Sequence, residues 1–518
     1  MVRLERLARA AVSDDAAAPR AAALVGGLVL VLMWAPLAVG YNISTPAWDE
    51  LFFLHNAVCV NHAVFSGSLH ELDLCLGAMA KSPIMAALLI PAGPLNGSIS
   101  KLSSAPVVLA LLTFSQIILL AVLTWRVRIP PLAIIIAAVS VFFTPALMQG
   151  GAPLLVDDLL AVTILNTLML LAVECDLPTH GLVPSIGRGI FWGVVGSIGL
   201  LSKLTYLLFA ALVFVPAVII SLRRSGIVAT AVKLLAALGI GLGAILVTLR
   251  YGQGYYAHAA AAAFGDLAQY YNDGLTRLAF LRSVEGSIRP LWIAVIILGC
   301  WAFWPGRISR ERAMISIYLL SIMLLYLFVA SGSQNRDPRF FWPIWLAIPF
   351  CLAIAVPPMK ASDRTVAASM VVVPAIVALA LSFAMLGRFD FSAVALAQRV
   401  LDLLPGNRPI NVIIVTDEGT FNIETLILAK RLGGSLHANK TIDTAVYDIV
   451  RNLSVADSIE RLREADYAIA REPLPVAAAP EWTNRFHQQF LAALQESDRV
   501  VATLQGNPNT IIFAKPTP

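Results

Sequence analysis

Apolar runs of about 20 residues dominate the hydropathy pattern of this chain as far as residue 386. A helix of that length crosses the hydrocarbon core of a bilayer, which is about 30 Å thick. The pattern therefore predicts about 11 membrane-spanning helices in residues 1–386. Their expected ranges are 21–40, 103–125, 130–148, 154–174, 189–202, 204–222, 229–250, 290–305, 313–332, 340–356 and 365–386. The predicted class of this part is an all-α polytopic membrane domain.

Basic residues in the short loops predict how these helices are oriented. The basic segments on one side are the N-terminal residues 1–20, "RVR" (126–128), "RRSG" (223–226), "RISRER" (307–312) and "KASDR" (360–364). Because positively charged loops remain in the cytoplasm, we expect a cytoplasmic N-terminus and an exported, periplasmic C-terminus. This orientation requires the chain to turn at "LLSKLTY" (200–206), between the fifth and sixth spans. No small-residue cleavage site follows the first span, so that span is expected to be a retained anchor.

Residues 387–518 show a different pattern, in which short apolar runs alternate with amphipathic stretches. "NVIIVTD" (411–417) predicts a buried strand, and "NIETLILAKRLG" (422–433) predicts a helix that ends at Gly. The alternation continues through "ADYAIAR" (465–471) and "NRFHQQFLAALQES" (484–497). We therefore predict a small exported α/β domain. No Gly-rich phosphate loop follows its first strand, which argues against nucleotide binding there.

Composition and charge agree with a membrane protein. Of the 518 residues, 58% are hydrophobic and 13% are charged, whereas soluble domains carry about 25% charged residues. The net charge of +5 lies mostly in short loops, so it indicates membrane orientation rather than nucleic-acid binding. Arg outnumbers Lys and Ala is abundant, which is typical of GC-rich bacterial genomes. The expected location is therefore the bacterial inner (plasma) membrane, with several passes.

Ionisable residues gather beside span ends on the predicted exported face. They are Asp49 and Glu50 after the first span, Lys81 in the interfacial stretch "KSPIMAALLIPAGP", Asp157 and Asp158 at the start of the fourth span, Lys203 between the fifth and sixth, and Arg336 and Arg339 before the tenth. Each has a structural interpretation: acids that favour helix starts, a snorkelling lysine, and interfacial arginine anchors. Charged groups beside a bilayer are also functional candidates, because they are costly unless solvated or paired. Carboxylates and cations together on one face suit a reaction on a phosphate-bearing lipid.

The layout of these motifs resembles the glycosyltransferase C superfamily, in particular the lipid A aminoarabinose transferases and the protein O-mannosyltransferases. The similarity rests on the Asp49-Glu50 pair, the Lys-x-Pro segment that begins at Lys81, the aspartates that start the fourth span, Lys203, and "RFFWP" (339–343). It departs at "KSP", where relatives often have Lys-Pro-Pro, and at the doubled aspartate. The resemblance implies an enzyme that moves a sugar from a polyprenyl phosphate to a glycan, lipid or protein acceptor on the exported face. No cofactor is expected.

The residue types suit this reaction. Transfer breaks an anomeric C–O bond and releases a phosphate anion, a weak base that needs no general acid, unlike the leaving group of a glycosidase. Cations must face the growing negative charge, and we expect the lysines and arginines of this face to bind the donor phosphate. The acceptor hydroxyl must lose its proton to a carboxylate, for which Asp49 is the expected general base and Glu50 the second candidate. Asp157 and Asp158 are also expected to be catalytic residues. A single displacement of this kind inverts the anomeric centre.

Two features of the first exported loop bear on metals and disulfides. His55, Cys59 and His62 would share one helix face, a spacing that suits zinc, but an interfacial helix with polar edge residues is the favoured interpretation. No metal is therefore expected. Cys59 and Cys75 share this loop, and in an oxidising compartment we predict a disulfide between them.

Two other classes of function remain open at this point. A secondary transporter would place charged residues inside the spans near the bilayer midplane, and this sequence shows few of them. It also shows no internal repeat, which argues against the repeat-built transporters. A non-enzymatic membrane scaffold with an exported binding domain is the second alternative.

Overall fold

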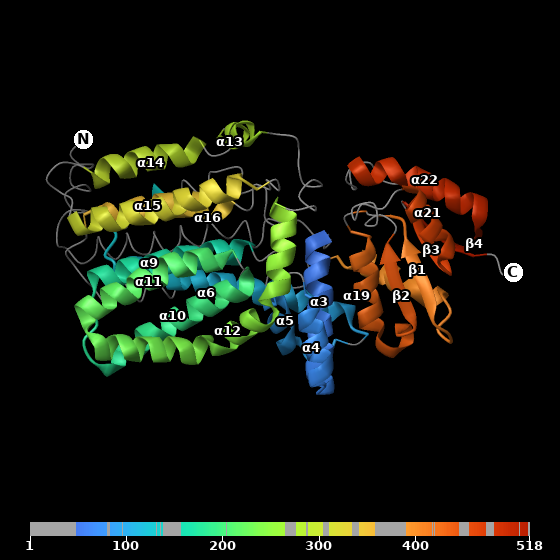
Figure 1. Cartoon of the computed structure of the whole chain (residues 1–518), viewed down its shortest axis with the longest axis horizontal. Helices are drawn as coiled ribbons and strands as arrows, with labels where there is room; N and C mark the ends of the chain where they lie inside the picture. The colour runs from blue at the N-terminus through green and yellow to red at the C-terminus, as the bar shows by residue number, and fades with distance from the viewer. Residues whose placement is uncertain are drawn as a thin grey trace, which may run out of the picture. The chain divides into compact units, whose positions relative to one another are not determined.

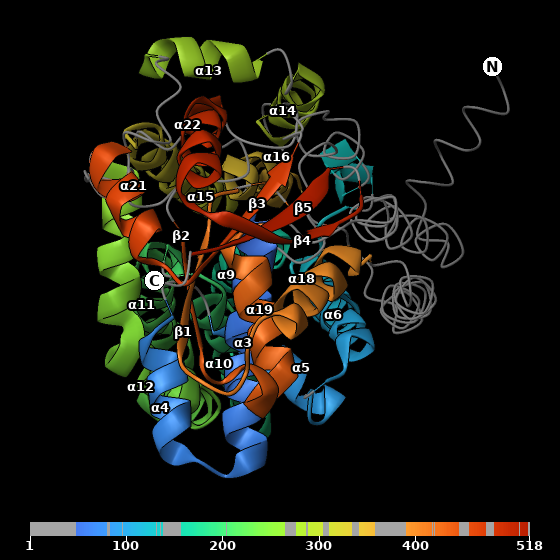
Figure 2. The same ribbon diagram turned by 90° about the vertical axis from the view of Figure 1, so that its right-hand side faces the viewer.

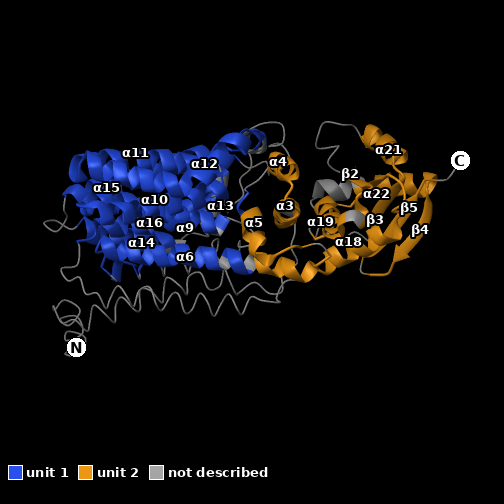
Figure 3. Cartoon of the chain, turned by 90° about the horizontal axis from the view of Figure 1, so that it is seen from below, with its two compact units in different colours: residues 1–42, 80–84, 106–386 blue, residues 43–79, 85–105, 387–518 orange. Residues whose placement is uncertain are grey.

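A computed structural model describes residues 48–79, 83–95, 97–130, 132–134, 136–137, 157–203, 205–264, 276–285, 289–303, 310–333, 341–357, 390–416, 418, 420–444, 455–472, 481–506 and 508–515. The chain divides into two compact units (Figure 3). The first unit comprises residues 1–42, 80–84 and 106–386, and the second comprises residues 43–79, 85–105 and 387–518. The second unit thus contains most of residues 41–102, the loop predicted to be the first exported loop, as well as the C-terminal part. The predicted division at residue 386 did not anticipate this grouping.

The first unit is built from helices, the longest of which lie side by side (Figure 1). They are α6 (Ser104–Arg126), α9 (Asp157–Asp176), α10 (Leu182–Ser202), α11 (Tyr206–Ser225), α12 (Ile227–Phe264), α13 (Arg277–Glu285), α14 (Arg289–Ala302), α15 (Arg310–Ser331) and α16 (Trp342–Ala355). In the described part of the chain, 6 helices are long and apolar enough to cross a membrane, and α14 and α16 are shorter apolar helices. The chain is a multi-pass membrane protein.

The helices coincide with the predicted spans wherever the structure describes them. A helix covers the predicted span 103–125 and each span from 154–174 to 340–356, and α12 extends well beyond its predicted end. The turn between the fifth and sixth spans is confirmed, because α10 ends at Ser202 and α11 begins at Tyr206. The predicted spans 21–40 and 365–386, and most of 130–148, lie outside the described residues. The total of 11 spans therefore stays a prediction.

Two glycines allow α10 and α12 to approach closely. A Cβ atom on Gly189 would lie 2.3 Å from the main-chain oxygen of Lys233, and one on Gly193 would lie 2.7 Å from that of Ala237. Small residues spaced by four form such helix contacts in membranes, where close van der Waals packing replaces the hydrophobic effect as the driving force. A larger side chain at either glycine would force the two helices apart.

The second unit contains a mixed sheet and the helices around it, which confirms a small α/β region near the C-terminus. Its helices are α3 (Trp48–Ser66), α4 (Leu69–Gly77), α5 (Ile84–Leu89), α18 (Ser392–Leu403), α19 (Ile423–Gly433), α21 (Val455–Glu464) and α22 (Glu481–Ser497). Its strands are β1 (Ile410–Ile414), β2 (Lys440–Thr444), β3 (Tyr467–Glu472), β4 (Arg499–Leu504) and β5 (Asn509–Ala514). They are ordered β2-β1-β3-β5-β4, with β1 parallel to β2 and β3, and β5 antiparallel to β3 and β4.

Helices cover both faces of this sheet (Figure 2). On one face, Leu462 of α21 and Phe490 and Leu494 of α22 pack against Ala468 and Phe513 of the strands. α18 and α19 pack together on the other side. α19 also packs against α3 within this unit.

A disulfide joins α3 to α4, as predicted. The Sγ atoms of Cys59 and Cys75 are bonded, and their Cα atoms lie 5.8 Å apart. The two helices fold back on each other at Gly67, whose φ of +70° suits a residue without a Cβ atom. The bond fixes α4 against α3 next to this turn.

Candidate functional site

The structure describes some of the predicted site residues completely and others in part. The side chains of Glu50, Asp157 and Lys203 are described. Asp49 and Asp158 lie in the first turns of α3 and α9, but their side chains are outside the description. Lys81, Arg336 and Arg339 lie outside the described residues. Of these three residues, Asp157 and Lys203 belong to the first unit and Glu50 belongs to the second.

Asp157 and Lys203 form an ion pair at one end of the helices of the first unit. Lys203 Nζ lies 2.6 Å from Asp157 Oδ1. The carboxylate begins α9, where the helix dipole favours an anion. The Asp157 side chain is 8% exposed and that of Lys203 is 31% exposed. The carboxylate is thus largely enclosed, whereas the ammonium group is still accessible to a ligand.

The turn that carries Lys203 is held against α9 by Tyr206. The hydroxyl of Tyr206 lies 2.6 Å from Oγ1 of Thr167, and both groups are buried. Its ring packs on Gly199, where a Cβ atom would lie only 2.4 Å from the ring. Lys203 itself has extended backbone angles that end α10, and its carbonyl accepts from the N–H of Tyr206 at 3.0 Å. The position of the Lys203 ammonium is therefore set by packing around the turn as well as by Asp157.

Glu50 lies in the first turn of α3 and is buried. An acid that only favours a helix start is normally solvated, so burial sets this carboxylate apart from the simple structural interpretation. Further along α3, Nε2 of His55 lies 2.7 Å from Oε2 of Glu424 on α19. Cys59 is oxidised in the disulfide and has no thiolate to offer to a metal. The His55, Cys59 and His62 set is therefore not a zinc site in this state.

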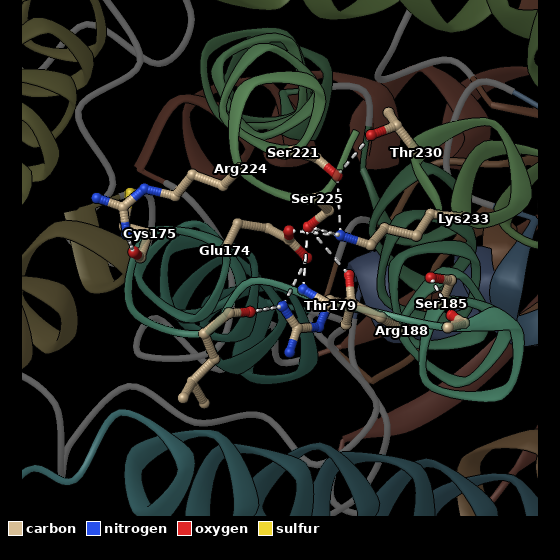
Figure 4. A network of polar contacts seen from close by, with 12 residues as sticks. Glu174, Cys175, Thr179, Ser185, Arg188, Ser221, Arg224, Ser225, Thr230 and Lys233 are labelled. Atoms are coloured by element: carbon tan, nitrogen blue, oxygen red, sulfur yellow. Dashed lines mark hydrogen bonds and ion pairs between the residues drawn. The ribbon is translucent and has the colours of Figure 1, made fainter. Parts of the chain in front are cut away.

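A buried polar cluster, which we call the Glu174 cluster, contains Glu174, Arg188, Ser221 and Lys233 (Figure 4). Lys233 Nζ lies 2.8 Å from Glu174 Oε2, and both side chains are 0% exposed. Arg188 Nη1 lies 3.2 Å from Glu174 Oε1. Lys233 Nζ also donates to Oγ of Ser221 at 2.8 Å. The cluster joins α9, α10, α11 and α12.

Further contacts tie the same ends of other helices together. Arg312, near the start of α15, pairs with Asp176 and donates to the main-chain oxygens of Val127 and Val356. Arg224 pairs with Glu311 at 3.0 Å. Val127, Arg224, Glu311 and Arg312 belong to the segments that were predicted to lie together on the cytoplasmic side.

The sequence interpretation missed the Glu174 cluster. A single Glu and a single Lys in long apolar runs carry no periodic signal, and the two residues are 59 positions apart. Glu174 lies close to the end of α9, and Lys233 lies near the start of α12, about 9 Å along a helix with a rise of 1.5 Å per residue. This position near the helix ends differs from the midplane site that the transporter alternative requires.

The fold is similar to that of a solved lipid A aminoarabinose transferase, ArnT, as the resemblance inferred from the sequence implied. ArnT from Cupriavidus metallidurans, solved bound to undecaprenyl phosphate, matches with a TM-score of 0.51 and 14% identity over 95% of this chain and 96% of that chain. Archaeal oligosaccharyltransferase AglB from Archaeoglobus fulgidus, solved with an inhibitory peptide and a dolichol-phosphate, has a TM-score of 0.47 and 12% identity over 87% of this chain and 69% of that chain. No protein-family model matches the sequence, and no curated protein matches it.

Proposed function

We propose that this chain is a glycosyltransferase of the bacterial inner membrane that moves a sugar from a polyprenyl phosphate to an acceptor on the periplasmic face. The proposal is supported by a fold that extends over nearly all of ArnT, a protein that was solved bound to undecaprenyl phosphate. The observation that carries it is the Asp157–Lys203 pair, which leaves a fixed and accessible cation at one end of the helices. The acceptor is a glycan, a lipid or a protein, and no cofactor is required.

Lys203 is proposed to bind the donor phosphate. An ammonium group has three N–H donors, of which the carboxylate of Asp157 accepts one at 2.6 Å. Negative charge grows on the phosphate oxygens as the sugar leaves, and a cation beside them would stabilise that charge. Because the carboxylate of Asp157 contacts Lys203 directly, Asp157 suits positioning of Lys203 better than the catalytic role expected from the sequence. Asp158, the next residue of α9, stays a second candidate for either role.

The remaining predicted cations, Lys81, Arg336 and Arg339, are proposed as further ligands of the same phosphate. A phosphate has several oxygens that accept charge-assisted hydrogen bonds, and arginine can bind two of them at once. More than one cation is therefore expected to share the developing charge.

The chemical step is proposed to be a single displacement. The acceptor hydroxyl attacks the anomeric carbon on the side opposite the phosphate, and the electron pair of the breaking C–O bond goes to the phosphate oxygen. The hydroxyl proton goes to the carboxylate of Asp49, or to that of Glu50, in the first turn of α3. The product therefore has the inverted anomeric configuration.

Binding of undecaprenyl phosphate to the purified protein tests the role of Lys203. Lys203→Ala should weaken binding about tenfold to a hundredfold, because a hydrogen bond to a charged group contributes about 1.5–3 kcal/mol. Lys203→Arg should restore part of it. Lys101→Ala is the matched control, because Lys101 is an exposed lysine whose Nζ donates to the carbonyl of Pro94 at 2.7 Å. Equal binding by Lys203→Ala and the unmodified protein would show that Lys203 does not hold the phosphate.

A further inference from the structure

α3 and α19 pack against each other in the second unit, although α3 belongs to the first exported loop and α19 to the C-terminal part. Leu51, Leu54 and Val58 of α3 are fully buried, at the spacing that places residues on one face of a helix. Leu428 and Leu432 of α19 are fully buried as well. The C-terminal domain thus supplies apolar cover for α3.

Two charged side chains of α19 hold the same residue of α3. Oε2 of Glu424 lies 2.7 Å from Nε2 of His55, and both side chains are largely buried. Nη1 of Arg431 donates to the main-chain oxygen of His55. Burial lowers the pKa of Arg431 to about 10, with Glu424 acting in the opposite direction, so this guanidinium stays charged at neutral pH. His55 is therefore held at its side chain and at its backbone.

α19 is itself well fixed. Asn422 caps its first turn by accepting from the N–H groups of Glu424 at 2.9 Å and of Thr425 at 3.3 Å. At the other end, the carbonyl of Leu432 accepts from the N–H of Gly97 at 2.6 Å. A capped helix that packs on a sheet has little freedom to move, so it is a firm support for α3.

Other contacts hold the second half of α3. Nδ2 of Asn61 donates to the carbonyls of Leu89 at 3.1 Å and of Gly93 at 3.0 Å. The disulfide from Cys59 to Cys75 lies in the same half. The helix is therefore fixed from residue 55 onward, whereas its first turn carries the acidic pair.

We propose that the C-terminal α/β domain acts to position α3, and that Glu424 and Arg431 are positioning residues for the acidic pair Asp49-Glu50. This inference rests on the proposed function, in which that pair supplies the general base. His55 follows Asp49 by six residues, or about 9 Å along a helix. A helix transmits a shift over such a distance, and a misplacement of about 1 Å at the reacting groups can lower a rate about a hundredfold.

The test compares Glu424→Ala and Arg431→Ala with Asp443→Ala in the full-length protein. Asp443 pairs with Arg461 at 2.7 Å in the same domain, and this pair joins β2 to α21 rather than α19 to α3. Amide hydrogen exchange of residues 48–58 reports on α3, and single-turnover transfer from an undecaprenyl-phosphate sugar reports on the chemical step. Binding of undecaprenyl phosphate reports on the donor site.

Glu424→Ala and Arg431→Ala should speed exchange in residues 48–58 and slow single turnover about tenfold to a hundredfold, with donor binding unchanged. Glu424→Gln, which keeps a hydrogen-bonding oxygen, should recover part of the rate, and Asp443→Ala should behave as the unmodified protein. Unchanged exchange in both alanine variants would overturn the proposal. Faster exchange without slower turnover would also overturn it, as would a loss of donor binding that accompanies the slower turnover. If the unmodified protein consumes no donor, the proposed function fails, and the exchange result still decides whether α19 holds α3.

Discussion

Glu174→Ala is expected to destabilise the protein strongly. The substitution removes the carboxylate that Lys233 contacts at 2.8 Å and Arg188 contacts at 3.2 Å. Lys233 is 0% exposed, and its ammonium group would keep hydroxyl partners such as Ser221 without an anionic partner among the described residues. The variant thus leaves an uncompensated buried charge, which is the costly way to break an ion pair.

The expected cost is about 3–5 kcal/mol, the range for removing one partner of a buried pair. Because each 1.4 kcal/mol is about a factor of ten, the unfolding equilibrium should shift about a hundredfold to several thousandfold. The matched control is Glu311→Ala. Glu311 pairs with Arg224 at the same end of the helices, but their side chains are 67% and 36% exposed. An exposed pair contributes about 0–1 kcal/mol, so this control should stay near the unmodified protein.

Unfolding of the purified protein by sodium dodecyl sulfate, followed by tryptophan fluorescence, measures the difference. Trp192 is a suitable reporter, because it is buried on α10 one turn beyond Arg188, with its ring centroid 5.8 Å from that of Phe214. A double variant, Glu174→Leu with Lys233→Met, replaces both charges with apolar groups and should recover most of the loss. The reasoning is refuted if Glu174→Ala and Glu311→Ala unfold at the same detergent concentration.

Three other predictions concern the site, the disulfide and the topology. Asp49→Asn keeps the shape of the side chain but cannot accept a proton, so single-turnover transfer should slow about 10²–10⁴-fold with donor binding unchanged. If Asp49→Asn turns over normally and Glu50→Gln loses activity, Glu50 is the base instead. Cys59→Ala with Cys75→Ala should lower the unfolding midpoint, because the bond closes the loop between α3 and α4 and such bonds typically contribute about 2–4 kcal/mol; an unchanged midpoint would contradict this. A reporter that is active only outside the cytoplasm, fused after Pro518, should be active, and an inactive but stably expressed fusion would reverse the orientation.

The sequence was sufficient to predict the described spans and the turn at Lys203. The length of an apolar run and the loss of apolar character between Ser202 and Tyr206 are local signals. They suffice because, within a membrane, each helix must form its backbone hydrogen bonds internally. That Asp157 and Lys203 lie on one side followed from counting spans between them. Their ion pair did not follow, because it depends on how α9 packs against the turn, through Thr167 and Tyr206.

The contacts that the sequence did not predict join residues far apart in the chain. His55 and Arg431 are 376 positions apart, and nothing in either segment indicates the other as its partner. The sequence favoured an interfacial helix around His55 and His62, and the bilayer surface was an equally good place for its apolar residues. Only the structure shows that α19 packs against this helix, and therefore that the second unit includes the first exported loop.

The central claim is that the chain transfers a sugar from a polyprenyl phosphate. The most direct measurement is mass spectrometry of the lipids after the purified protein is incubated with a panel of undecaprenyl-phosphate sugars and bacterial envelope lipids, glycans and proteins as acceptors. The account predicts that at least one donor is converted to undecaprenyl phosphate while its sugar appears on an acceptor, and that Asp49→Asn with Glu50→Gln abolishes both changes. A transporter or a scaffold would consume no donor. Intact donors with every acceptor, in the presence of folded protein that binds undecaprenyl phosphate, would contradict the account.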